Sequence, residues 1–269
     1  MSEIITFDDI EFELPARPGV LAELSAELEA EDPDFRKVSA LVNTDLGLAA
    51  AVVKTANSPY FGVSGRIGSV QHAINFLGLS QVFSLVSGAM LRGAFPEHDP
   101  LMDELWDIST KRAALMARLA RNTTIPPDRA YTVGLFQDCG VAMLAARVSD
   151  YRPTWQRTRW LPDAPERERE EHVTDHPTLS ALLVQHWRLP PEIAQAVRFH
   201  HQIDRLAALD VFAPTRSLVA LSVLANLVLV QALSEDVAPW EAQLNQAAAL
   251  LHVPQLVAQT WVEQAGSLL

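Results

Sequence analysis

Helical periodicity runs through this sequence from end to end, and it constrains the fold more than any other feature. Apolar residues recur at the three- and four-residue spacing of helices, and no stretch alternates apolar and polar residues convincingly enough to indicate a sheet. Residues that can cap a helix stand before many of these segments, at Asp34, Asp45, Ser69, Ser80 and Asp99. The sequence therefore predicts an all-α fold.

Break signals divide the predicted helices into two groups. Short helices are expected between about residues 18 and 94, and longer ones at about 100–121, 128–147, 177–187, 190–201, 214–233, 239–252 and 254–268. The polar, proline-bearing stretch 95–100 is the best candidate joint between the groups. We therefore expect an N-terminal lobe of about residues 14–95 and a second lobe of about residues 99–210, which the helices in 211–269 complete.

Composition limits the compartment and the partners. The single cysteine, Cys139, excludes an intrachain disulfide, and no charged-then-apolar leader opens the sequence, so we expect a cytoplasmic protein. The apolar run 217–233 contains Ser222 and Asn226 and is shorter than the roughly 20 residues that a bilayer needs, which favours a buried helix. A net charge of −12 repels a phosphate backbone. We expect neither a nucleic-acid partner nor a membrane partner.

Several short blocks together resemble the HDOD family. They are LPARP (14–18), DLGL (45–48), ANSPYFG (56–62), AINFLG (73–78), GLFQDCG (134–140) and RFHH (198–201). In this order and spacing they resemble an HDOD domain over about residues 14–210. The resemblance implies a helical bundle in which an N-terminal lobe packs on a degenerate HD-domain lobe. It also implies a non-catalytic module of bacterial signal transduction that binds signalling proteins in trans; neither the partner nor the oligomeric state is indicated.

The second lobe is similar to HD phosphohydrolases, and the resemblance implies where their metal ligands would fall. The first histidine is replaced by Ile108, the His-Asp pair by Gln137 and Asp138, and the late aspartate by Asn226. An isoleucine cannot bind a metal, and a neutral amide is a poor ligand. We therefore expect no catalytic residue and no metal cofactor. Asp138 is predicted to be structural, held by amide groups such as those of Gln137 and Asn226.

A residual metal site is the alternative. His176, His200 and His201 match additional histidines that metal-binding HD-GYP relatives use, and with Asp138 they would support a phosphohydrolase acting on nucleotides or cyclic dinucleotides. Against this, neighbouring residues on a helix point about 100° apart, so His200 and His201 should not face one site.

Two further groups are candidates for binding. Asn57, Ser58, Tyr60 and Phe61 form a loop that could meet a partner or small ligand; alternatively, they cap a helix and fill the core. A second, basic-aromatic patch has an ordinary surface as its simpler interpretation, and comprises Arg152, Arg157, Arg159, Trp155 and Trp160. Cys139, in an apolar context, is interpreted as packing.

Overall fold

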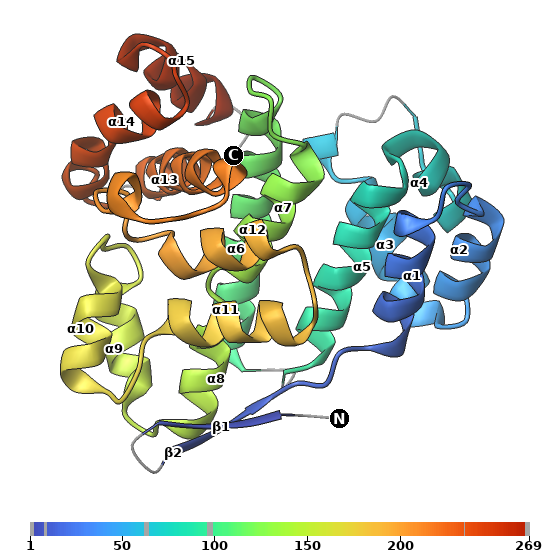
Figure 1. The fold of residues 1–269 in the computed structure, drawn as a ribbon, viewed down its shortest axis with the longest axis horizontal. Helices are drawn as coiled ribbons and strands as arrows, with labels where there is room; N and C mark the ends of the chain where they lie inside the picture. The colour runs from blue at the N-terminus through green and yellow to red at the C-terminus, as the bar shows by residue number, and fades with distance from the viewer. Residues whose placement is uncertain (1–2, 8–9, 62–64, 96–98, 234, 267–269) are drawn as a thin grey trace. The chain divides into compact units, whose positions relative to one another are not determined.

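The computed structural model describes residues 3–7, 10–61, 65–95, 99–233 and 235–266. Helices make up nearly all of its regular structure (Figure 1), so the predicted all-α class is confirmed. The chain forms two compact units, a smaller one of residues 17–97 and a larger one of residues 1–16 and 98–269.

A short antiparallel hairpin in the larger unit was not predicted. Strand β1 (Glu3–Phe7) pairs with β2 (Ile10–Leu14), with Glu3 opposite Leu14. In β2 the buried side chains of Phe12 and Leu14 alternate with exposed glutamates, so the period of two is present. It covers only five residues, which is too few to stand out against helical periodicity. The hairpin contacts α8 (Cys139–Arg147) and α11 (His176–His186).

The smaller unit is a group of short helices. They are α1 (Gly19–Glu29), α2 (Phe35–Val42), α3 (Leu46–Ala56), the 3-10 turn η1 (Pro59–Phe61), α4 (Val70–Leu77) and α5 (Leu79–Gly93). The side chains of Asp34, Asp45 and Ser69 accept from backbone N–H groups at the starts of α2, α3 and α4, as predicted. Ser80 does not cap a helix, because α5 already begins at Leu79, directly after Gly78 with a φ of 83°.

The larger unit contains the longer helices. They are α6 (Pro100–Ala120), α7 (Pro127–Phe136), α8 (Cys139–Arg147), α9 (Tyr151–Thr158), α10 (Ala164–Glu171), α11 (His176–His186), α12 (Pro191–Phe199), the 3-10 turn η2 (Leu206–Ala208), α13 (Ala213–Ala232), α14 (Ala238–Leu250) and α15 (Gln255–Gly266). Asp99 caps α6 through the Leu101 N–H, as predicted. Figure 1 shows α11, α12 and α13 stacked side by side, and neighbours in this stack are in contact.

Helix α13 is the centre of this unit. By length and composition it could cross a membrane, with a mean hydropathy of 1.6, but 78% of its most apolar window is buried within the protein. It contacts α6, α7, α12, α14 and α15. A helix that is apolar on all sides and surrounded by other helices has the character of a core helix, as the sequence predicted for this run.

The single helix expected at 128–147 is wrong, because the chain breaks between α7 and α8. Gln137 ends α7 as its C-cap, and Asp138 precedes α8 with φ −107° and ψ 9°, outside helical geometry. The break places the side chains of Gln137 and Asp138 in the interior, where they are 1% and 4% exposed.

Gly140 explains how closely α8 approaches α11. A Cβ atom at this position would lie 2.2 Å from the carbonyl oxygen of His176, a distance that real Cβ atoms do not reach. The Gly140 N–H donates to the Ser180 hydroxyl of α11 at 2.7 Å. The first turns of α8 and α11 are therefore pressed together, and this contact brings Asp138 and His176 side by side.

We expect Gly140→Ala to destabilise the protein by about 1–3 kcal/mol, because the added methyl group must displace the backbone of His176. Chemical denaturation measures the change in the free energy of unfolding. Gly93→Ala is the matched control: no atom lies within 4 Å of its Cβ position, and it ends a helix. An unchanged free energy of unfolding in Gly140→Ala would contradict the close contact.

Candidate functional site

Three of the positions that the resemblance assigns to HD metal ligands, Gln137, Asp138 and Asn226, line one small cavity in the larger unit, and a buried arginine joins them. Arg112 on α6 is 2% exposed. Its Nη1 donates to Asp138 Oδ2 at 2.6 Å, and its Nε donates to Asn226 Oδ1 at 2.7 Å. Gln137 turns elsewhere, since its Oε1 accepts from the Ser222 hydroxyl at 2.8 Å. Asp138 is thus held in a polar interior, with Arg112 rather than an amide as its principal partner.

Sequence reasoning missed Arg112, although a signal was present. Arg112 lies four residues after Ile108, one helical turn away, and so shares a helix face with the first ligand position. It stands in the apolar run that ends α6, where a charged residue needs a buried partner. The guanidinium attracts Asp138 strongly: although burial opposes ionisation, Arg112, His200 and His176 hold the pKa of the Asp138 carboxyl well below its usual range.

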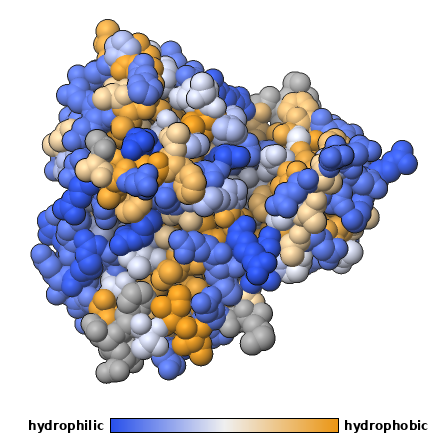
Figure 2. Space-filling view, viewed as in Figure 1, coloured by the Kyte–Doolittle hydropathy of each residue, from blue (hydrophilic) through white to orange (hydrophobic). Residues whose placement is uncertain are grey.

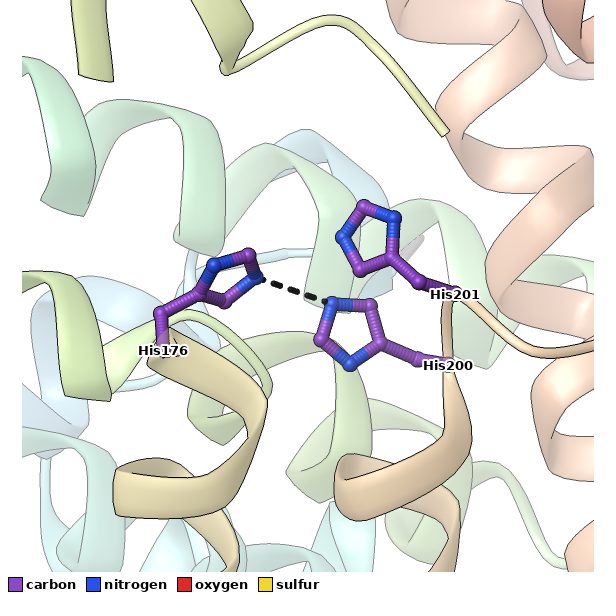
Figure 3. A group of neighbouring side chains, drawn as sticks. All are labelled: His176, His200 and His201. Carbon is purple, nitrogen blue, oxygen red and sulfur yellow. Dashed lines mark hydrogen bonds between the residues drawn. The ribbon is translucent and has the colours of Figure 1, made fainter. Parts of the chain in front are cut away.

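Three histidines meet on the other side of Asp138 (Figure 3). One ring nitrogen of each lies within 4.8 Å of the others. His176 Nε2 lies 3.4 Å from His200 Nε2, and the ring centroids of His200 and His201 are 4.2 Å apart. Asp138 Oδ1 lies 3.3 Å from His200 Nε2 and 3.6 Å from His176 Nε2. We call His176, His200 and His201 the histidine cluster.

The expectation that His200 and His201 cannot face one site is wrong. Helix α12 ends at Phe199, so His200 is its C-cap and His201 lies in the following turn. The 100° spacing of neighbouring side chains applies only inside a helix. Beyond its end the chain turns both rings toward His176, as Figure 3 shows.

Each ring of the histidine cluster has its Nδ1 engaged by an acceptor. His200 Nδ1 lies 2.7 Å from the Val197 carbonyl oxygen, and His201 Nδ1 lies 2.7 Å from that of Pro162. A carbonyl oxygen only accepts, so both Nδ1 atoms carry a proton and donate. His176 Nδ1 likewise donates to the Glu168 carboxylate at 2.8 Å. In every ring the Nε2 atom is therefore left for the centre of the cluster.

Glu168 is a second residue that sequence reasoning missed. It belongs to the highly charged helix α10, yet its exposure is 0%. Its carboxylate accepts from the Tyr151 hydroxyl at 2.6 Å and from the His176 backbone N–H at 2.8 Å. Burial and the Glu168 charge raise the pKa of Tyr151 well above its usual value, so the phenol stays protonated and donates.

The charges around the cluster are balanced. Burial opposes a charge on His176, but Glu168, Asp138 and Asp175 outweigh it and raise the pKa of His176. Burial lowers the pKa of His200, and burial with the neighbouring rings lowers the pKa of His201 well below its usual value. Of the three rings, His176 is thus the one whose surroundings favour an extra proton, while those of His200 and His201 favour the neutral ring.

A small cavity adjoins these groups. Among its lining residues are Arg112, Asp138, His176, His201, Trp155 and Trp240. The volume open to the centre of a water molecule is about 10 Å³. This is close to the minimum that one water needs.

The other candidate loop is partly structural. Asn57 Nδ2 donates to the carbonyl oxygens of Val53 and Ile67, and its Oδ1 accepts from the Ile67 N–H, all at 2.8 Å. It therefore ties the end of α3 to the following loop. Phe61 is 9% exposed and belongs to the core of the smaller unit, while Ser58 is half-buried. The side chain of Tyr60 lies outside the described residues.

The basic-aromatic patch is an ion-paired surface. Arg152 pairs with Asp99, Arg157 with Glu171, and Arg159 with Glu104. Trp155 is buried at 3% exposure. Cys139 is buried as well, and burial raises the pKa of its thiol to about 12, so it is a packing residue as the sequence indicated.

The residues at the primary HD positions do not fit a metal ion. Ile108 is apolar and buried, Gln137 is committed to Ser222, and the guanidinium of Arg112 already bonds Asp138 and Asn226. A cation placed there would meet a buried positive charge. The histidine cluster does fit a metal, because it presents three imidazole nitrogens, and Asp138 Oδ1 lies near those of His176 and His200; zinc and similar ions take such donors.

We expect Asp138→Ala to destabilise the protein by about 3–5 kcal/mol, because it leaves the charge of Arg112 buried without a carboxylate. Chemical denaturation followed by circular dichroism measures the change. The matched control, Asp107→Ala, removes an exposed carboxylate that pairs with Lys111 on the same helix, and it should leave the free energy of unfolding almost unchanged. Equal, small effects of both substitutions would show that the buried pair does not support the fold.

Comparison with known proteins identifies the family to which the chain belongs. A model of the HDOD domain matches residues 14–203. An uncharacterised protein of Treponema pallidum is 24% identical over 220 residues, which are 77% of this chain and 41% of that protein. YuxH of Bacillus subtilis, also uncharacterised, is 30% identical over 115 residues, 42% of this chain and 28% of its own length. The chain thus spans less than half the length of these curated relatives.

Solved structures share the fold. A Shewanella amazonensis protein, provisionally assigned as a phosphohydrolase, has a TM-score of 0.72 at 21% identity, covering 95% of this chain and 92% of its own. An HDOD domain protein of unknown function from Geobacter sulfurreducens has a TM-score of 0.69 at 19% identity, covering 96% and 94%. A Marinobacter aquaeolei protein, provisionally assigned to signal transduction, has a TM-score of 0.70 at 21% identity, covering 94% and 56%. Because the family model matches well over half of the sequence, the chain belongs to the HDOD domain family.

Proposed function

We propose that this chain is a non-catalytic interaction module of bacterial signal transduction. The observation that carries the proposal is the place of Arg112. Hydrolysis of the HD type needs a metal held at the primary positions with a coordination site open to water. Here the guanidinium bonds Asp138 Oδ2 and Asn226 Oδ1, so neither atom is free for a metal at the primary positions.

The size of the cavity supports the same conclusion. Pockets that bind small molecules usually enclose about 300–1,000 Å³. The cavity beside Asp138 offers about 10 Å³ to the centre of a water molecule, too little for a phosphate ester. A substrate would have to displace Trp155 and Trp240, which line the cavity and are almost fully buried.

The partners we propose are signalling proteins supplied in trans, in the cytoplasm. Their class follows from the family and from the Marinobacter aquaeolei protein of the same fold that is provisionally assigned to signal transduction. Nucleic acid is a poor partner for a chain of net charge −12. Figure 2 shows a mostly hydrophilic surface over α9 and α10, where arginines such as Arg157 and Arg167 are paired with acids. For a membrane-spanning role we see no support, since α13 is mostly buried.

The second candidate is a metal-dependent phosphohydrolase acting on nucleotides or cyclic dinucleotides. One observation favours it: the histidine cluster can hold a metal without the primary positions. The Shewanella amazonensis protein of the same fold carries a provisional assignment of this class.

Turnover separates the two candidates. We expect no hydrolysis of nucleoside phosphates or cyclic dinucleotides above the buffer rate when the full chain is supplied with Mn²⁺, Fe²⁺ or Zn²⁺, because the cavity cannot accept the substrate. Product release followed by chromatography measures the rate. His201→Asn, within the histidine cluster, is the test variant. His72→Asn, on the exposed side of α4, is the matched control. Metal-dependent turnover that His72→Asn retains and His201→Asn loses would overturn the proposal in favour of the hydrolase.

A further inference from the structure

We infer that His176, His200, His201 and Asp138 form a closed four-donor site for a single divalent transition metal, with a structural rather than catalytic role. This site differs from the primary HD positions, where the guanidinium of Arg112 supplies the positive charge. The inference goes beyond the proposed function and does not depend on it.

The distances between the donor atoms match tetrahedral coordination. Zinc bonds to imidazole nitrogen and carboxylate oxygen are about 2.0–2.2 Å long, so neighbouring donors in a tetrahedron lie ~3.3–3.6 Å apart. The Nε2 atoms of His176 and His200 are 3.4 Å apart, and Asp138 Oδ1 is 3.3 Å and 3.6 Å from them. Three of the four donors therefore already stand at the required spacing. The nitrogen of His201, the one half-buried ring of the cluster, lies within 4.8 Å of those of His176 and His200, so a metal would require this ring to turn inward.

The hydrogen bonds of the three rings suit metal ligands. A histidine that binds a metal almost always donates its other ring N–H to a carboxylate, a backbone carbonyl or water. The cluster has one carboxylate partner, Glu168, and two carbonyl partners, Val197 and Pro162. All three Nε2 atoms are consequently directed toward the centre of the cluster. Histidines that only fill a core do not require their Nε2 atoms to face one another. Without a cation, lone pairs of neutral rings would face one another and a carboxylate, so the centre requires either a proton or a metal.

Asp138 closes the site. Its Oδ2 accepts from Arg112, while its Oδ1 faces the histidine nitrogens. The carboxylate thus takes the fourth coordination position, which a catalytic zinc site leaves to water or substrate. An ion bound here would join the start of α8, the start of α11 and the end of α12. Nitrogen and oxygen donors in a tetrahedral set favour zinc, with cobalt as a spectroscopic substitute.

Metal binding to the full chain tests the inference. Protein treated with a chelator is titrated with Zn²⁺ and with Co²⁺, and bound metal is counted by elemental analysis. His201→Asn is the test variant, because the amide of asparagine can replace Nδ1 as the donor to Pro162 while no atom replaces Nε2. His72→Asn is the matched control. Circular dichroism establishes that each variant is folded.

We expect one metal per chain in the unmodified protein and in His72→Asn, with the intense visible absorption of tetrahedral Co²⁺. Removing an outer hydrogen bond of a metal ligand typically lowers metal affinity ~10–100-fold. His201→Asn removes a ligand itself, so we expect its metal affinity to fall by more than this. The inference is overturned if the unmodified protein binds no more metal than His201→Asn, or if bound Co²⁺ gives only the weak absorption of octahedral coordination. Binding without turnover supports this inference and the proposed function together. Binding with turnover would overturn both the structural role inferred here and the proposed function, whereas absence of binding overturns this inference and leaves the proposed function standing.

Discussion

The buried ion pair between Arg112 and Asp138 is the interaction on which the rest of the larger unit depends. It joins α6 to the break between α7 and α8, and the second bond of Arg112 reaches Asn226 on α13. The three elements are those that hold the metal in the HD phosphohydrolases that this lobe resembles. A buried charge needs a partner of opposite sign, and here each member of the pair supplies it to the other. The side chain of Arg112 thus supplies a cation at the centre of this unit.

The histidine cluster follows from the same pair. Because Arg112 holds Oδ2 of Asp138, the carboxylate is fixed with Oδ1 toward His176 and His200. The close approach at Gly140 sets His176 beside it. Glu168 then fixes the ring of His176 from behind. Each contact constrains the next, so the packing of the helices specifies how the nitrogen atoms are arranged.

Sequence reasoning could predict the helical class, most helix starts and the loss of the primary ligands. These depend on local signals: Asp34, Asp45 and Asp99 cap helices through their own neighbours, and Ile108 can be compared with a histidine directly. It could not predict the partner of Asp138, because Arg112 and Asn226 are distant in sequence and meet only through packing. It also failed at His200 and His201, where the argument assumed a helix that ends at Phe199. The hairpin was missed because only β2 alternates apolar and polar residues, and it is five residues long.

A double-mutant cycle between Arg112→Met and Asp138→Asn, followed by chemical denaturation, tests most directly whether an internal cation organises this site. If the pair is coupled as the structure indicates, each single substitution destabilises the protein and the double variant loses less than the sum, by about 2–3 kcal/mol, because neither buried charge is left alone. Additive effects, within about 0.5 kcal/mol, would show that Arg112 and Asp138 contribute independently and would contradict the account.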